Sequence, residues 1–360
     1  MIKFKSKTFQ EYYEYVYDYE LKFFHYSFNL SENTEEEYKL FEEDINTLRD
    51  SLSDDYFKIY FGELDTVEKL FNATNIFNNY KDFIYIRVRD NTEYKKMKSI
   101  IGDMNVKIIV EKENLNSIDN IDNSIVLQVD NVKDLKNSDL DLLCCKYKIT
   151  NVLVGQYVQL SANSMDYYND ESKRFNIPNK NGKYDYYNIE KNCMISNDIY
   201  SIDTYKKIYN KLVSLVSNVN ADDNEYDRFH TVYMNIVDKI DYNYGGFGIL
   251  DNQNMYGGLI NDTCVCEGFG KILNQALNLV DIDSIIVNGI DPNGGEGHVW
   301  NQVKIDNDWY NADASTDSIR RSKGLSSCMC LVDDSALYYK IDSPIAEVCN
   351  KTYEEKQKRL

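Results

Sequence analysis

Short apolar runs separated by helical or polar stretches are the feature that most limits the fold of this 360-residue chain. The runs lie at 83–88, 106–110, 125–129 and 152–154. Runs of this length predict strands, and strands that alternate with helices predict a small α/β unit with a partly parallel sheet. Gly102 stands alone in this region, without the glycine fingerprint of a phosphate-binding loop, so the sequence does not support a nucleotide site.

Helices are predicted on both sides of this unit. Residues 7–53 have the apolar spacing of two amphipathic helices, and Thr34 with Glu37 fits a capping box at the start of the second. Further helices are predicted from about 201 to 218 and from 225 to 240, where apolar residues recur on one face.

The middle of the chain separates two predicted domains. Residues 156–200 are polar and rich in tyrosine, which is typical of a linker or an irregular surface segment. We therefore predict a helical and then α/β region over 1–155, whose role the sequence does not indicate, and a second domain over 201–360.

The charge of the chain limits its partners. A net charge of −19 repels phosphate backbones and anionic lipid, so neither nucleic acid nor a membrane surface is expected as a partner. No stretch of 18 consecutive apolar residues is present, and the N-terminus has no uninterrupted apolar core of a secretory signal. We expect a soluble cytoplasmic protein. The sequence does not predict an oligomeric state.

Eight cysteines in such a chain do not predict a disulfide framework. Cys264 with Cys266, and Cys328 with Cys330, form C-x-C pairs, whereas structural zinc sites use C-x2–4-C pairs. We expect no metal and no cofactor.

Glycine marks the part of the chain where chemistry is concentrated, because 11 of the 16 glycines lie between Gly245 and Gly297. Within this part, Cys266 precedes a predicted helix with one apolar face. A cysteine in the first turn of a helix meets unpaired N–H groups and the positive end of the helix dipole, which favour the thiolate. On local sequence alone, a buried structural cysteine is an equal alternative.

His298 strengthens the case for a catalytic cysteine. The chain has three histidines, and His25 and His230 lie in contexts typical of packing or surface residues. His298 instead follows a glycine-rich stretch and opens a predicted strand, 298–305, in which it shares one face with Trp300. This setting suits a general base that is reachable and yet shielded.

Asp313 is predicted to reach His298 through a hairpin. Asp306 and Asn307 fit a two-residue turn that pairs Ile305 with Asp308. Continued pairing would place Asp313 diagonal to His298 on the same face, where Cβ atoms lie about 7 Å apart. A carboxylate there could fix the tautomer of the imidazole and stabilise its charged form.

These residues resemble the transglutaminase-like superfamily of cysteine peptidases, whose bacterial members share three sequence elements. The elements match CVCEGF, GHVWN and WYNAD in this chain, and the resemblance covers roughly residues 226–317. It implies an α+β fold with a papain-like transglutaminase core, in which the nucleophile at a helix N-terminus packs on an antiparallel sheet. It assigns Cys266 as nucleophile, His298 as general base and Asp313 as orienting acid. Cys264 departs from the family, which has a small residue there.

The resemblance also implies a reaction class. Cys266 would attack an amide of a peptide or protein and form a thioester, with Tyr256, Gly268 and Trp300 on the oxyanion or substrate side. If water then attacks the thioester, the protein is a peptidase or amidase, which is the alternative that we favour. If a lysine amine attacks the thioester instead, the protein is a cross-linking transglutaminase. A non-catalytic interaction module is the third alternative.

Overall fold

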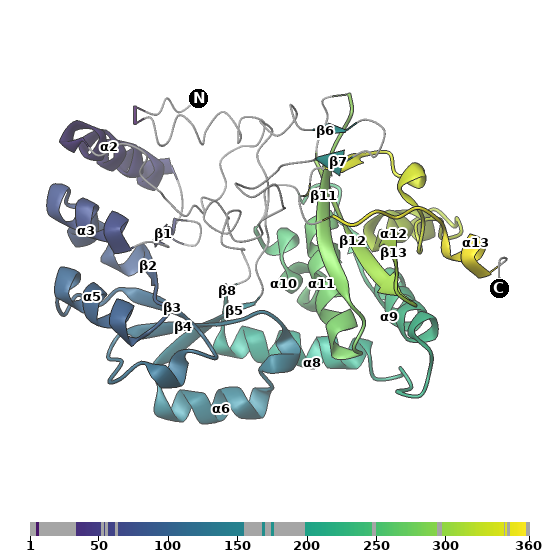
Figure 1. Ribbon diagram of the computed structural model, residues 1–360, viewed down its shortest axis with the longest axis horizontal. Helices are drawn as coiled ribbons and strands as arrows, with labels where there is room; N and C mark the ends of the chain where they lie inside the picture. Colours follow the sequence, from purple (N-terminus) through teal and green to yellow (C-terminus); the bar gives the residue numbers. More distant parts are fainter. Residues whose placement is uncertain are drawn as a thin grey trace. The chain divides into compact units, whose positions relative to one another are not determined.

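The structure is a computed structural model in which the chain forms two compact units (Figure 1). The first is built mainly from residues before Asp130, and the second from residues after Asp203 together with Asn131–Asp134. The residues that the structure describes are 5–6, 34–51, 54, 57–61, 64–154, 168–169, 174–175, 199–246, 250–293, 297–341, 343 and 346–357. The helix predicted between 7 and 33, and most of the predicted segment 156–200, lie outside them. The division into three parts stays a prediction.

A six-stranded sheet forms the centre of the first unit, in the order β1-β2-β3-β4-β5-β8. Its strands are β1 (Ile59–Phe61), β2 (Ile84–Arg87), β3 (Lys107–Glu111), β4 (Ser124–Val129), β5 (Ile149–Val154) and β8 (Ile199–Ser201). The first five pair in parallel and β8 pairs antiparallel to β5. The predicted α/β region with a partly parallel sheet is thus confirmed.

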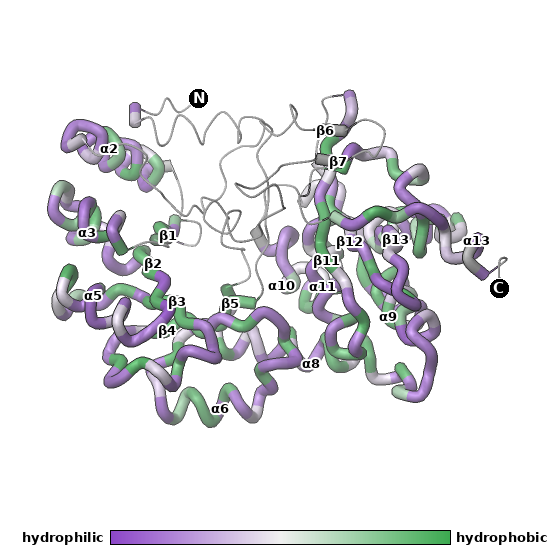
Figure 2. The backbone as a smooth tube through the Cα atoms, viewed as in Figure 1, coloured by the Kyte–Doolittle hydropathy of each residue, from purple (hydrophilic) through white to green (hydrophobic). Residues whose placement is uncertain are grey.

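The residue pattern of these strands explains the burial of the sheet. On one face, the four central strands β2 to β5 carry buried aliphatic side chains, namely Ile84, Ile86, Ile108, Val110, Ile125, Leu127, Val152 and Val154. Figure 2 shows β2, β3 and β5 as largely hydrophobic. The other face has an apolar centre, which includes Tyr85 and Val126, and an ion pair of 2.8 Å between Arg87 and Glu111.

Helices precede and connect the parallel strands of the first unit. They are α2 (Glu35–Ser51), α3 (Leu64–Ala73), α4 (Ile76–Tyr80), α5 (Asn91–Ile101) and α6 (Asn137–Lys146). Because neighbouring parallel strands follow each other in chain order, right-handed crossovers bring their helices to one face, as α3, α5 and α6 show in Figure 1. The predicted cap of α2 is present, since Thr34 Oγ1 accepts the Glu37 N–H at 3.2 Å.

An antiparallel sheet in the order β13-β12-β11-β14 forms the framework of the second unit. Its strands are β11 (Ser284–Ile290), β12 (His298–Ile305), β13 (Asp308–Ala312) and β14 (Lys340–Ile341). The short pairs β9 (Asp241–Tyr242) with β10 (Thr263–Cys264), and β6 (Tyr168–Asn169) with β7 (Arg174–Phe175), complete the strands described. The hairpin between β12 and β13 has the predicted register, with Ile305 opposite Asp308 and positive φ at both Asp306 and Asn307.

The second unit has six described helices, and three of them, α9, α10 and α12, pack against α11, which also lies against β11 and β12 (Figure 1). The six helices are α8 (Ile202–Leu215), α9 (Glu225–Lys239), α10 (Met255–Ile260), α11 (Cys266–Leu279), α12 (Ala314–Ser322) and α13 (Tyr353–Gln357). Ile272, Leu273, Ala276 and Leu277 of α11 are fully buried, as their helical spacing predicts. The predicted antiparallel sheet with a packed helix is confirmed, and the chain as a whole is a mixed α/β protein.

Among the described residues, no helix combines the length and the apolar character needed to cross a membrane.

Gly257 of α10 allows a close approach that positions the segment before Cys266. A Cβ at this position would overlap the backbone oxygens of Asp251 and Thr263, the latter at 2.9 Å, and backbone cannot move aside cheaply. We expect Gly257→Ala to lower the free energy of unfolding by about 1–3 kcal/mol, the usual cost of overpacking. Gly245→Ala is the control, because the nearest atom lies 3.8 Å away. Urea unfolding measures both, and equal stabilities of the two variants would contradict the packing role.

Candidate active site

Cys266 occupies the first position of α11, after the extended N-cap residue Val265. Val265 has no side chain that could accept a hydrogen bond from the first turn, whereas its own N–H binds the backbone oxygen of Asn252 at 3.0 Å. The side chain of Cys266 is therefore presented at a helix N-terminus whose N–H groups lack a side-chain cap. Cys266 is 4% exposed.

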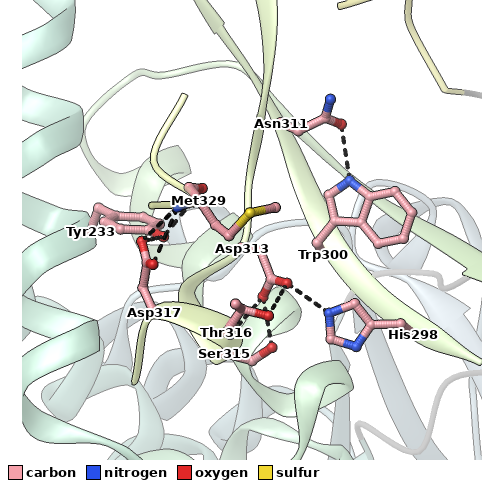
Figure 3. Close-up of polar contacts among 9 residues, drawn as sticks. All are labelled: Tyr233, His298, Trp300, Asn311, Asp313, Ser315, Thr316, Asp317 and Met329. Atoms are coloured by element: carbon pink, nitrogen blue, oxygen red, sulfur yellow. Dashed lines mark hydrogen bonds and ion pairs between the residues drawn. The ribbon is translucent and has the colours of Figure 1, made fainter. Parts of the chain in front are cut away.

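His298 and Asp313 meet at the end of the hairpin sheet. His298 Nε2 lies 2.7 Å from Asp313 Oδ2, and both residues are buried (Figure 3). The register of the hairpin is the predicted one, but the predicted continuation of strand pairing as far as Asp313 is wrong. β13 ends at Ala312, and Asp313 is the N-cap of α12. The chain leaves the sheet at the carboxylate because the following residues satisfy it as a helix cap.

Two hydroxyl residues hold the Asp313 carboxylate, and sequence reasoning missed both. Ser315 Oγ donates to Oδ1 at 2.7 Å, and Thr316 Oγ1 donates to Oδ2 at 2.6 Å (Figure 3). The Thr316 N–H also donates to Oδ1 at 3.0 Å. The sequence Asp-Ala-Ser-Thr followed by a polar helix is an N-cap signal that could have revealed this arrangement.

The electrostatics of the pair favour an ionised imidazole and carboxylate. Burial by itself lowers the pKa of His298, but the charge and hydrogen bond of Asp313, followed by Cys266, raise it to about 10. Burial raises the pKa of Asp313, but His298 and then Thr316 outweigh it and lower this pKa to about 2. Because Nε2 binds Asp313, Nδ1 is the ring nitrogen that remains for a further partner. The structure thus brings His298 and Asp313 into contact, and the contribution of Cys266 to the pKa of His298 places the thiol near them.

The distance between α11 and β12 is set by a glycine and an asparagine. Asn301 Nδ2 donates to the Gly270 carbonyl at 2.9 Å. A Cβ at Gly270 would lie 3.3 Å from Val299 Cγ1, so the helix approaches the strand closely at this point. Gly270 lies one turn after Cys266, and Asn301 lies three residues after His298. The helix that carries Cys266 and the strand that carries His298 are therefore fixed to each other near these two residues.

Trp300 supports His298 from the same strand. The Trp300 ring is buried, and its Nε1 donates to Asn311 Oδ1 at 3.0 Å. It stacks on the His298 ring with a centroid distance of 6.0 Å and an interplanar angle of 22°. Trp300 is 2% exposed and contributes to the setting of the histidine, whereas its role on the substrate side stays a prediction.

The two other predicted substrate residues have local roles in the structure. A Cβ at Gly268 would lie 2.7 Å from Cys264 Cβ and 2.9 Å from the Asn252 oxygen, so this glycine permits close packing of α11. Its role on the substrate side stays a prediction. Tyr256 lies in α10, where its N–H is capped by Asn254 Oδ1 at 2.8 Å. A role of its hydroxyl as an oxyanion donor stays a prediction.

A second buried carboxylate, Asp317, lies one helical turn after Asp313. It accepts hydrogen bonds from the Tyr233 hydroxyl at 2.6 Å and from the Cys328 N–H at 2.8 Å. It also accepts the Met329 N–H at 3.2 Å, and the Met329 carbonyl accepts the Asp313 N–H at 3.0 Å (Figure 3). Burial raises the pKa of Asp317. Asp317 thus fixes the segment against which the backbone of Asp313 rests.

The cysteine pairs differ in their surroundings. Cys264 is buried, and burial followed by the charge of Cys266 raises its pKa. Cys328 is exposed, and burial raises the pKa of Cys330 to about 12. Within the described part of the chain, His, Cys, Asp and Glu side chains form no group of three that could hold a metal ion.

The ion pair predicts a specific pH dependence of stability. Because the pKa of His298 rises from 6.5 to about 10 on folding, its contribution is full below pH 6.5 and is lost as the pH rises through 10. Because the pKa of Asp313 falls from 3.8 to about 2, its contribution is full above pH 3.8 and is lost as the pH falls through 2. The difference in unfolding free energy between the wild type and Asp313→Asn should be largest between pH 3.8 and 6.5.

Denaturant unfolding of the wild type and Asp313→Asn between pH 3.8 and pH 10 measures this difference in unfolding free energy. The control is Asp241→Asn, which breaks a solvent-exposed ion pair with Arg321 and should change stability little. A wild-type advantage over Asp313→Asn that stays constant up to pH 10 would contradict the buried ion pair.

Comparisons with known proteins give partial similarities. A scan against protein families and a search of curated proteins each found no match. Among solved structures, the chain is similar to a transglutaminase (TGase), with a TM-score of 0.28 and 15% identity over 32% of each chain. It is also similar to a candidate cysteine protease from Cytophaga hutchinsonii, with a TM-score of 0.25 and 14% identity over 44% of each chain. Each match spans less than half of the solved chain.

Proposed function

We propose that this protein is a cysteine-dependent acyl-transfer enzyme with a papain-like transglutaminase core, which hydrolyses amide bonds of a peptide or protein. The observation that carries the proposal is the contact of 2.7 Å between His298 Nε2 and Asp313 Oδ2, with Cys266 contributing to the raised pKa of His298. A nucleophile, a base and an orienting carboxylate in series are the groups that thiol-dependent acyl transfer requires.

The charges of the three residues support the roles that we assign to them. The raised pKa of His298 means that the imidazole keeps a proton at neutral pH beside the sulfur of Cys266. A protonated imidazole stabilises the thiolate, which is the nucleophilic form of cysteine. The Asp313 carboxylate, ionised because its pKa is about 2, fixes the orientation of the ring through Nε2.

The proposed reaction has two balanced steps. The Cys266 sulfur attacks the amide carbonyl, the C–N bond breaks, and His298 transfers its proton to the leaving amine. The resulting thioester is then attacked by water, whose proton passes to His298 while the acid product leaves and the thiolate is restored. Asp313 stays ionised throughout, as an orienting group should.

The helix N-terminus supports stabilisation of the oxyanion. A tetrahedral intermediate on Cys266 carries a negative oxygen, which backbone N–H groups at a helix N-terminus can bind. The N–H of Cys266 itself is the donor that we propose. The low exposure of Cys266 and His298 strengthens such interactions, since charges attract more strongly where water is excluded.

The charge of the chain limits the partners that we propose. A net charge of −19 opposes binding to nucleic acid and to anionic membranes, so we propose neither as a partner.

Thiol alkylation tests the proposed site without knowledge of the substrate. Iodoacetamide at pH 7 should modify Cys266 at least about tenfold faster than the exposed Cys328, because an imidazolium lies near Cys266 and stabilises its thiolate. His298→Ala should slow the modification of Cys266 by about 100-fold, the usual contribution of a proton-transfer partner. His230→Ala is the matched control, since His230 lies in α9 and stacks on Tyr226. Peptide mass mapping measures each rate.

Equal and slow modification of Cys266 and Cys328 would contradict the catalytic role and favour the interaction module. The acceptor is tested separately, with a glutamine-containing protein and a labelled primary amine. Cleavage without incorporation of the label is expected. Incorporation of the amine that depends on Cys266 would contradict hydrolysis and identify a transglutaminase.

A further inference from the structure

Tyr339 lies against the candidate base, although it is distant from it in the sequence. Its ring stacks on the His298 imidazole with a centroid distance of 4.6 Å and an interplanar angle of 20°. This is closer than the stacking of Trp300, at 6.0 Å. Tyr339 is half-buried and packs against an apolar cluster that includes Val287 and Leu337. The imidazole therefore has an aromatic neighbour from a part of the chain that neither the hairpin nor α11 provides.

The chain on both sides of Tyr339 is anchored. The preceding Tyr338 hydroxyl donates to Asp291 Oδ1 at 3.1 Å and accepts a hydrogen bond from Asn293 Nδ2 at 2.8 Å. The following residues form β14, in which Ile341 pairs with Gly289 of β11. Gly289 is itself the partner of His298 in the sheet. Tyr339 is thus held from two sides by the strands and the turn that also hold the histidine.

A ring at this position restricts a motion that the hydrogen bonds leave possible. The hydrogen bond from Nε2 to Asp313 fixes one end of the imidazole, but the ring can still pivot about that contact and turn Nδ1 away from Cys266. A flat ring stacked on its face opposes the pivot and excludes water from that side. The titratable groups that face His298 are Asp313, Cys266 and Tyr339. Burial, followed by the charge of Cys266, raises the pKa of the Tyr339 hydroxyl, so this ring stays neutral.

We propose that Tyr339 is a positioning residue for His298, whose ring keeps Nδ1 directed at Cys266 and shields the His298–Asp313 hydrogen bond from water. The effect on Cys266 rests on the proposed function, whereas the shielding of the hydrogen bond does not. We therefore expect one effect on the reactivity of Cys266 and a separate effect on the His298–Asp313 hydrogen bond.

The experiment compares three variants in the full-length chain. Tyr339→Leu removes the stacked ring but keeps an apolar side chain against Val287 and Leu337. Tyr339→Phe removes the hydroxyl and keeps the ring. Tyr226→Leu is the matched control, because Tyr226 stacks on His230 at 5.6 Å and 24° outside the site. Circular dichroism and thermal unfolding check that each variant is folded.

Two readouts are measured on every variant. The first is the downfield proton resonance of His298 Nε2–H, assigned by its absence in His298→Ala, together with its exchange rate with water. The second is the rate at which iodoacetamide modifies Cys266 at pH 7. The resonance reports the shielded hydrogen bond without any need for activity, and the alkylation rate reports the contact with Cys266.

Tyr339→Leu should broaden or abolish the resonance through faster exchange and should slow alkylation of Cys266 about tenfold, as expected for a misplaced partner group. Tyr339→Phe and Tyr226→Leu should match the wild type in both readouts. If Tyr339→Leu does not fold, Tyr339→Trp replaces it, and this larger ring should keep the resonance.

The inference is overturned if folded Tyr339→Leu keeps both the resonance and the alkylation rate, or if Tyr339→Phe loses as much as Tyr339→Leu. It is also overturned if the wild type shows no resonance or if folded Tyr339→Trp loses it. Slow alkylation of Cys266 in the wild type, with a resonance that depends on the Tyr339 ring, would contradict the proposed function and leave the shielding role standing.

Discussion

The buried contact between His298 and Asp313 joins the first residue of a strand to the N-cap of a helix. Two buried ionisable groups are stable only where each satisfies the other and further hydrogen bonds satisfy what remains. Here Ser315 and Thr316 donate hydrogen bonds to the carboxylate, and Cys266 helps to raise the pKa of the imidazole. The end of the hairpin, the start of α12 and the start of α11 must therefore meet at one place, and the packing of the second unit brings them there.

The neighbourhood of this contact restrains it in several directions. Asp317 fixes the backbone segment that binds the Asp313 N–H. Asn301 and Gly270 hold the strand of His298 against the helix of Cys266. Trp300 and Tyr339 stack on the imidazole. A catalytic group needs such support because small displacements are costly for proton transfer, whereas an ion pair that served stability alone could be replaced by apolar residues at no loss.

The sequence predicted the features that depend on local pattern. The strands of the first unit follow from their apolar runs, and the pairing of Ile305 with Asp308 follows from a two-residue turn. β1 and β8 were missed because each has three residues, too few to show a period. The hairpin pattern predicts pairing past Ala312, whereas in the structure Asp313 caps a helix and the strand ends before it. Tyr339 could not be found, since its contact with His298 depends on how the chain returns to the sheet through β14. The roles of the site residues stay predictions.

The central claim is that Cys266 becomes acylated with the help of His298 and Asp313. It is tested most directly by treating the protein briefly with p-nitrophenyl acetate at neutral pH, quenching with acid and mapping the acetyl group by mass spectrometry. We expect an acetyl thioester on Cys266 that forms faster than on Cys328, is removed by hydroxylamine, and is nearly absent in His298→Ala. Acetyl groups spread evenly over cysteines and lysines, with the same pattern in His298→Ala, would contradict it.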